Sequence, residues 1–205
     1  GTDDSVLLAQ RLAYPTPSTA DVTAQTTAYD RRTGLASTVM RAYVNANIGP
    51  AAPTARRINV LTMAADPLVG TTTFGAARFD VLGELLSGIA AVDGLGFDIL
   101  QNGSELQFRV FAPQDKSDFI RMDVANDTLA STRYSYSAPG STVAIVAGAG
   151  VDAARVFRQV TTTESQAAEL AWDKRIEAFI DEQNTSNVDE LNQAGLERLA
   201  DDGNT

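Results

Sequence analysis

Residues 97–111 read Phe97-Asp-Ile-Leu-Gln-Asn-Gly-Ser-Glu-Leu-Gln-Phe-Arg-Val-Phe111. The Asn102-Gly103 pair in the middle predicts a two-residue β-hairpin turn of type I′, because these residue types accept the positive φ angles that such a turn requires. After the turn, apolar Leu106, Phe108 and Val110 alternate with polar residues. This period of two predicts a strand with one buried face and one solvated face.

Two helices are predicted before the hairpin. Residues 79–92 carry a broad apolar stripe at helical spacing, so we expect a packed helix in spite of two glycines inside it. Apolar residues at the same spacing predict a helix over residues 35–47, with Thr33 as its cap. Residues 60–64 fit a short strand, and residues 5–13, which end at two prolines, fit an edge strand.

The pattern after the hairpin is mostly that of strands. We expect strands over residues 119–124, 130–137, 142–146, 154–160 and 174–180. Helices are expected over residues 164–171 and 189–200, the second one capped by Asn187 or Ser186. The sequence therefore predicts an α+β fold that is rich in β-structure, with antiparallel sheets and a few packed helices.

The charge balance argues against two classes of partner. The chain has 205 residues, of which 26 are acidic and 16 basic, and its formal net charge is -10. Specific binding to nucleic acid requires clustered Lys and Arg to neutralise phosphates, so we expect none here. The longest apolar stretches, such as residues 142–151, are far shorter than the roughly 20 residues of a membrane helix, so we expect no membrane insertion either.

Histidine and cysteine are both absent from the sequence. Their absence excludes Ser-His and Cys-His nucleophile pairs and the commonest zinc sites. The clusters Thr71-Thr-Thr73 and Thr161-Thr-Thr163 are typical of strand ends, and Gly148-Ala-Gly150 is typical of a tight turn rather than a dinucleotide fingerprint. We expect no catalytic, cofactor-binding or metal-ligating residues, and no cofactor.

Paired carboxylates keep one enzymatic alternative open. Asp181-Glu182 and Asp189-Glu190 are acids of the type that glycoside hydrolysis uses in pairs. Their polar surroundings favour a solvated surface role, and the second pair suits the start of a helix. Trp172 fits either a core position or an interface hot spot, whereas Tyr134 and Tyr136 form no evident sugar-stacking platform.

Several ordered stretches together resemble a known family. They are Thr27-Ala-Tyr-Asp-Arg-Arg-Thr-Gly34, Val39-Met-Arg-Ala-Tyr-Val-Asn-Ala-Asn47, Ala77-Arg-Phe-Asp-Val-Leu82, Gly94-Leu-Gly-Phe-Asp-Ile99, Leu106-Gln-Phe-Arg-Val-Phe-Ala-Pro113, Tyr134-Ser-Tyr-Ser-Ala-Pro139, residues 143–150, Lys174-Arg-Ile-Glu-Ala-Phe-Ile180 and Leu191-Asn-Gln-Ala-Gly195. The set resembles the minor tail, or baseplate hub, proteins of siphophages that infect actinobacteria.

This resemblance implies a structural, non-enzymatic role. It implies a virion protein of the phage tail tip, made in the host cytoplasm, that is a homotrimer at full length. Its implied partners are other tail proteins, namely the distal tail, tape measure, and tip or fibre proteins. It also implies a division into an inserted α+β domain, residues 14–112, and a β-rich hub segment, residues 1–13 and 113–205, in a fragment of a longer protein.

Two alternatives to this role remain. The chain could be a module that binds carbohydrates of the host cell envelope. A tail-associated glycoside hydrolase that uses carboxylates alone is the other alternative.

Overall fold

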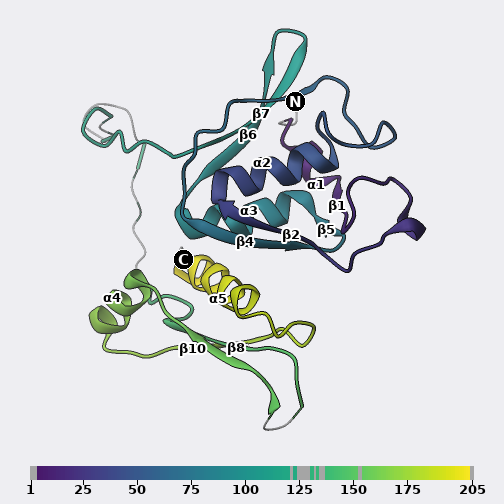
Figure 1. Ribbon diagram of the computed structural model, residues 1–205. Helices are drawn as coiled ribbons and strands as arrows, with labels where there is room; N and C mark the ends of the chain where they lie inside the picture. The colour runs from purple at the N-terminus through teal and green to yellow at the C-terminus, as the bar shows by residue number, and fades with distance from the viewer. Residues whose placement is uncertain are drawn as a thin grey trace.

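The computed structural model describes residues 4–120, 122–123, 130–131, 133, 137–151 and 154–203. The described residues form two clusters of buried apolar side chains. The members of one cluster lie in the range Leu8–Val110, and those of the other lie in the range Ala144–Leu199. We call residues 4–111 the N-terminal part and residues 137–203 the C-terminal part. Helix α5 (Val188–Gly203) belongs to the C-terminal part and lies on the side that faces the N-terminal part (Figure 1).

The predicted hairpin is confirmed, but its turn is displaced by one residue. Strands β6 (Gly96–Asn102) and β7 (Glu105–Phe111) pair antiparallel, with Asn102 opposite Glu105. The two turn residues are therefore Gly103 and Ser104, and Gly103 has a φ of 64°. A type I′ turn requires a positive φ at both turn positions, and Ser104 is not among the described residues with a positive φ, so the turn is of type II′ and the predicted type I′ turn is wrong.

Strand β3 (Leu61–Met63) joins the hairpin in parallel and confirms the strand expected over residues 60–64. The resulting sheet has the order β3-β7-β6. Because β3 runs parallel to β7, this sheet is mixed rather than purely antiparallel. Phe108 is fully buried on its inner face, as the alternation in the sequence predicts.

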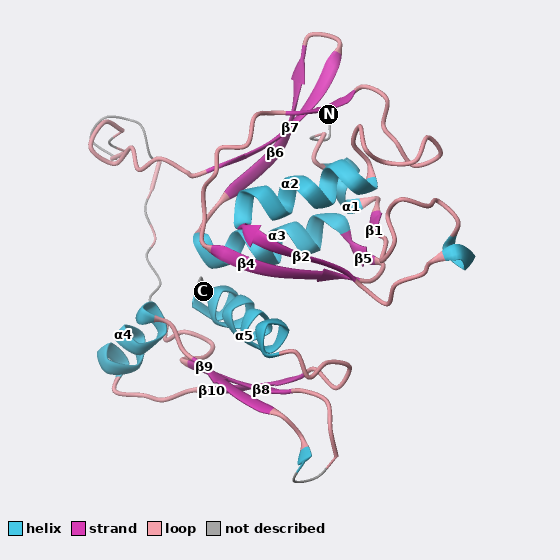
Figure 2. Cartoon of the chain, viewed as in Figure 1, coloured by secondary structure: helices cyan, strands magenta, loops and turns pink. Residues whose placement is uncertain are grey.

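Two helices pack beside this sheet and fill the larger core (Figure 2). Helix α2 (Ala36–Asn47) and helix α3 (Leu82–Asp93) occupy the two regions where the sequence predicts helices. The predicted cap is wrong, because Thr33 lies in strand β2 and α2 begins without a side-chain cap. Side chains buried in this core are Leu8, Val39, Met40, Tyr43, Val44, Leu82, Leu86, Ile89, Ile99 and Phe108.

Two small sheets close the N-terminal part, and the sequence pattern did not predict their pairing. Strand β2 (Asp30–Leu35) pairs antiparallel with β4 (Thr72–Ala77). Strand β1 (Leu12–Ala13) pairs antiparallel with β5 (Asp80–Val81). The edge strand predicted over residues 5–13 is mostly wrong, because helix α1 (Val6–Ala9) takes up its first half. A short 3-10 helix, η1 (Val22–Ala24), lies in the loop before β2.

The C-terminal part is a three-stranded sheet with two helices. Strands β8 (Val143–Ala147), β9 (Phe157–Val160) and β10 (Glu177–Asp181) confirm three predicted strands, although β9 and β10 begin later than expected. Helix α4 (Thr163–Trp172) connects β9 to β10, and Thr162 closes its first turn through a capping box. Asn187 caps α5 as predicted, since its Oδ1 accepts from the Asp189 N–H at 2.9 Å.

Two of the predicted strands fall in the connection between the parts. At the positions that the structure describes, neither is a strand. Within residues 119–124, positions 119, 120, 122 and 123 are not in a strand, and the others lie outside the described residues. Within residues 130–137, positions 130, 131, 133 and 137 are not in a strand, and the rest, including Tyr134 and Tyr136, are outside the described residues.

The elements found confirm the α+β class. The domain division implied by the resemblance stays a prediction. In the structure Leu8 and Ala13 pack into the core of the N-terminal part, and the second core is formed by residues of the C-terminal part.

Helix α5 sits very close to its sheet at Gly195. A Cβ atom at this position would lie 2.6 Å from Cγ2 of Val160 on β9, whereas a Cβ at Gly203 in the same helix would meet nothing within 4 Å. Leu191 and Leu199, one turn on either side of Gly195, are buried in the same core. A residue without a side chain is therefore needed where the helix crosses the sheet.

We predict that Gly195→Ala lowers the free energy of unfolding by about 1–3 kcal/mol, because the added methyl group overpacks the core against Val160. Gly203→Ala is the matched control, and we expect it to change stability by less than about 0.5 kcal/mol. Urea titrations of both variants, followed by circular dichroism, measure the difference. Equal stability of the two variants would contradict the packing described above.

Candidate functional site

The contact between the two parts is polar and is made by one face of α5. Thr73 on β4 donates from Oγ1 to Oε1 of Gln193 at 2.9 Å, and both side chains are buried. Gln193 in turn donates from Nε2 to Oε1 of Glu197 at 3.0 Å. At the start of the helix, Nε of Arg31 donates to Oε1 of Glu190 at 2.6 Å. These bonds tie α5 to β2 and β4 of the N-terminal part.

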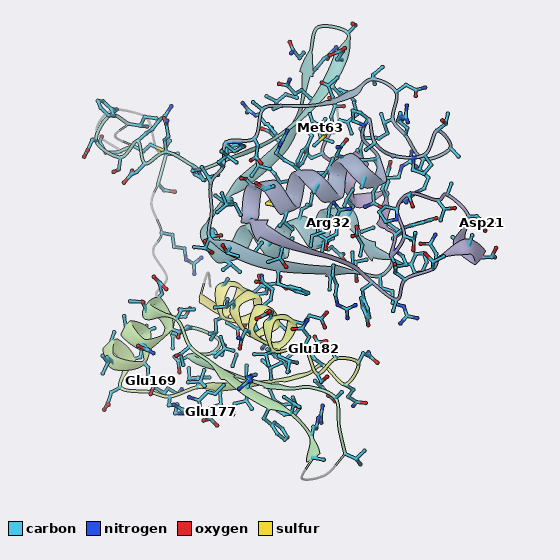
Figure 3. The ribbon with its side chains drawn as sticks, viewed as in Figure 1. Asp21, Arg32, Met63, Glu169, Glu177 and Glu182 are labelled. Atoms are coloured by element: carbon cyan, nitrogen blue, oxygen red, sulfur yellow. The ribbon has the colours of Figure 1, made fainter. Side chains whose placement is uncertain are left out.

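A groove of about 530 Å³ runs along this contact. The C-terminal part contributes Glu182, Glu190 and Glu197 to its wall. The N-terminal part contributes the acids Asp80 and Glu84 and the base Arg78. Glu182 lies beside α5 on the side that faces the N-terminal part (Figure 3). The groove is thus strongly acidic and is bordered by both parts of the chain.

Burial and crowding raise the pKa of two of these acids. Burial is the main cause for Glu197, and the charges of Asp201 and Glu182 raise its pKa further, against the opposing effect of the Gln193 hydrogen bond. For Glu182, burial again comes first, followed by the charges of Glu190 and Asp181. Each carboxylate thus loses part of its hydration in the folded chain and faces other negative charges.

The structure brings together only part of the carboxylate set that the sequence singles out. Glu182 and Glu190 both line the groove. Asp181 instead forms an ion pair with Arg155 and accepts from Nε2 of Gln183 at 2.7 Å. Asp189 is exposed in the first turn of α5. The solvated surface position expected for these acids is found for Asp189. It is not found for Glu182, which is partly buried.

Glu197 is one of the groove residues that the sequence pattern did not indicate. It follows Gln193 by one helical turn, on the polar side of α5. A polar helix face normally indicates contact with water. Nothing in the local pattern shows that Glu197 packs against Gly88 of α3, where a Cβ would lie 3.1 Å from its carboxyl carbon.

A second hollow of about 450 Å³ lies among α3, α4 and α5. Trp172, at the end of α4, is half-buried and forms part of its wall. The wall also includes the apolar residues Ala91, Val92, Leu196, Leu199 and Ala200. Trp172 therefore has neither a fully buried core position nor a fully exposed one.

The other motifs singled out in the sequence lie in a strand, at the start of a helix and in the connection after β8, and of these Thr73 also makes the bond to Gln193 described above. Thr72 and Thr73 lie in β4, and Thr162 caps α4 by accepting from the Ser165 N–H at 3.0 Å. Gly148-Ala-Gly150 follows β8 directly, in a turn where Gly150 has a φ of 119°. The strand-end interpretation is confirmed for Thr72 and Thr73, which begin β4, but it is wrong for Thr162 and Thr163, which begin helix α4.

The described residues include neither a metal-binding cluster of acids nor a membrane-spanning helix. No cluster of three or more Asp or Glu side chains there could hold a metal ion. No helix in these ranges is long and apolar enough to span a bilayer.

Comparison with known protein families shows which family the chain belongs to. All of it, residues 1–205, matches the family described as Siphovirus ReqiPepy6 Gp37-like protein. The chain belongs to this siphovirus family. The siphophage relationship predicted from the sequence is thereby confirmed. No curated protein and no solved structure matches the chain.

We predict that Glu197→Gln stabilises this siphovirus protein at neutral pH. Folding raises the pKa of Glu197 above its ordinary value of 4.5. The protonated side chain of Glu197 therefore contributes to the stability of the fold. This contribution is fully present below pH 4.5 and is lost as the pH rises through the raised pKa. The amide oxygen of the variant can still accept from Gln193, but the variant carries no buried charge.

Thermal unfolding between pH 4 and pH 8 tests this prediction. We expect a melting temperature above that of the unmodified chain at pH 8 and no difference at pH 4. Glu105→Gln, which removes an exposed charge on β7, serves as the control. A melting temperature of Glu197→Gln at or below the unmodified value at pH 8 would contradict the assignment.

Proposed function

We propose that this chain is a structural component of a phage tail tip, in the baseplate hub, that acts by self-association and by docking onto other tail proteins. Membership of a siphovirus family along all of residues 1–205 is the observation that carries the proposal. The ordered motifs that resemble minor tail and hub proteins narrow it to the tail. The proposed partners are the distal tail, tape measure, and tip or fibre proteins, with a homotrimer at full length.

The chemistry of the side chains supports a role in assembly rather than catalysis. The sequence has no histidine and no cysteine to serve as base, nucleophile or soft metal ligand. Two of the four acids that could act in a glycoside hydrolase are engaged with arginines, Glu190 with Arg31 and Asp181 with Arg155. The hydrogen bond from Gln183 and the hydrogen bond and charge of Arg155 lower the pKa of Asp181, which makes this carboxylate a poor general acid.

The charge of the chain suits a position close to passing DNA. A net charge of -10 repels the phosphate backbone, so a surface of this kind would not retain DNA.

A second candidate function, binding of cell-envelope carbohydrate, has one observation in its favour. The hollow beside Trp172 combines an indole side chain with the side chains of Ser137, Glu164 and Ser165. Sites for small molecules combine apolar and aromatic walls with a few polar groups in this way. Binding of the chain to purified actinobacterial cell wall, lost in Trp172→Ala, would favour this candidate.

The hub proposal predicts a closed oligomer of the full phage protein that contains this chain. Size-exclusion chromatography with light scattering should give a trimer, and electron microscopy of the intact virion should place the protein in a ring at the tail tip. A strictly monomeric protein with no ring on the virion would overturn the proposal. Loss of turbidity of a peptidoglycan suspension on adding the protein, abolished by Glu182→Gln, would support the hydrolase alternative instead.

A further inference from the structure

The tip of the β6–β7 hairpin extends beyond the body of the N-terminal part, on the side away from the C-terminal part (Figures 1 and 2). Every residue from Leu100 to Glu105 is exposed. The tip contains Asn102-Gly103, and no other asparagine in the sequence is followed by glycine. An exposed asparagine before glycine can react with the backbone of its own chain, because glycine has no side chain that obstructs the approach.

The two groups that would react have no hydrogen-bond partner within the described ranges. The side-chain amide of Asn102 makes no bond there, and the N–H of Gly103 donates to no acceptor. The carbonyl of Gly103 accepts from Nε2 of Gln101 at 3.4 Å, which does not involve the N–H. The turn accounts for this freedom, because the ladder of the hairpin ends at the pair of Asn102 and Glu105 and leaves both turn residues outside it.

The space around the turn also permits the reaction. A Cβ atom at Gly103 would meet nothing within 4 Å. Gly103 has a φ of 64°, a conformation that glycine adopts at little cost. The backbone nitrogen of Gly103 can therefore approach the side chain of Asn102 without displacing a neighbouring group.

Two other asparagines show what distinguishes this position. Asn59 is exposed as well, but it is followed by Val60, whose branched side chain is stiff and crowds the adjacent backbone. Asn47 is fully buried, and its side-chain amide bonds to Tyr14, Tyr43 and Arg56. Only Asn102 among these three combines exposure, an unbonded amide and an unhindered neighbour.

We propose that Asn102 is a site of spontaneous deamidation, which converts a neutral hairpin tip into an acidic one. The backbone nitrogen of Gly103 attacks Cγ of Asn102, so that a new N–Cγ bond forms and the Cγ–Nδ2 bond breaks. The leaving Nδ2 group takes up the proton of the Gly103 amide and departs as ammonia. The product is a five-membered succinimide ring in the chain.

Water then opens the ring in one of two ways. Addition at Cγ breaks the new N–Cγ bond and yields an aspartyl residue. Addition at the backbone carbonyl carbon of position 102 breaks the bond from that carbon to nitrogen and yields an isoaspartyl residue, whose backbone runs through the former side chain. Overall the chain consumes one water and releases one ammonia, and no oxidant or reductant takes part.

Either product alters the end of the hairpin. The new carboxylate lies directly across the ladder from Glu105, and like charges in such a pair are destabilising. The isoaspartyl product also lengthens the backbone just before the turn, so the last pair of the ladder can no longer close in the same register. Deamidation thus adds a negative charge to the exposed tip and loosens its last pair.

Peptide mapping of the folded chain during incubation at pH 8 tests the proposal. Trypsin cuts after Arg57, Arg78 and Arg109. Asn59 and Asn102 therefore fall in different fragments, and each is the only asparagine of its fragment. We expect the Asn102 fragment to gain one mass unit and to separate into aspartyl and isoaspartyl products, at a rate roughly tenfold or more above that of the Asn59 fragment. A sample taken before incubation gives the background.

Asn102→Gln is the variant that blocks the reaction. Its longer side chain would have to close a six-membered ring, which forms more slowly, while the tip keeps an uncharged amide. In anion-exchange chromatography the unmodified chain should develop a more acidic species with time, and the variant should not. Circular dichroism confirms that the variant is folded, and a synthetic peptide of residues 97–111 gives the rate without the fold.

The possible outcomes are distinct. Conversion in the folded chain that is absent from Asn102→Gln supports the proposal. An Asn102 that stays intact in the folded chain while the free peptide converts shows that the fold protects this side chain, which overturns it. Equal rates at Asn59 and Asn102, or an acidic species that forms equally in Asn102→Gln, also overturn it.

Discussion

Helix α5 is the element on which the arrangement of the chain depends, because its two faces bind different partners. Leu191 and Leu199 on one face complete the apolar core of the C-terminal part. On the other face, Gln193 bonds to Thr73 and Glu190 bonds to Arg31, both in the N-terminal part. The apolar face attaches the helix to its sheet by hydrophobic burial, whereas the polar face positions the two parts through directional bonds.

The polar contact has an electrostatic cost. Glu197 and Glu182 lie in an acidic groove where burial and neighbouring carboxylates raise their pKa values. A contact of this kind specifies the relative position of two parts more than it adds to their stability. That character suits a protein of a siphovirus family whose proposed work is to fit beside other chains.

Local signals in the sequence predicted the elements with clear periodicity, but they did not predict the strands that form only through pairing with distant residues. The hairpin and the two long helices of the N-terminal part have clear periodicity, and the structure confirms them. Strand β2 was missed because Thr33 and Gly34 pair with Phe74 and Thr73 of β4, about forty residues away, so their strand conformation depends on tertiary contact. The hairpin turn is shifted by one residue because Gly103 fits either the second position of a type I′ turn or the first position of a type II′ turn. The local sequence does not distinguish these two positions. The groove was missed for the same reason as β2, since Glu197 and Gly88 are neighbours in space alone.

Through the bonds of Gln193 and Glu190, α5 holds the two parts in one fixed relative position, which a distance measurement tests directly. The chain has no cysteine, so spin labels can be attached at introduced cysteines without background. Electron-electron double resonance on Gln101→Cys combined with Ala167→Cys, one exposed site in each part, measures the distance between them. We expect one narrow distance distribution that broadens when Gln193→Ala and Glu190→Ala remove the polar contacts. A broad distribution in the chain with these contacts intact would contradict it.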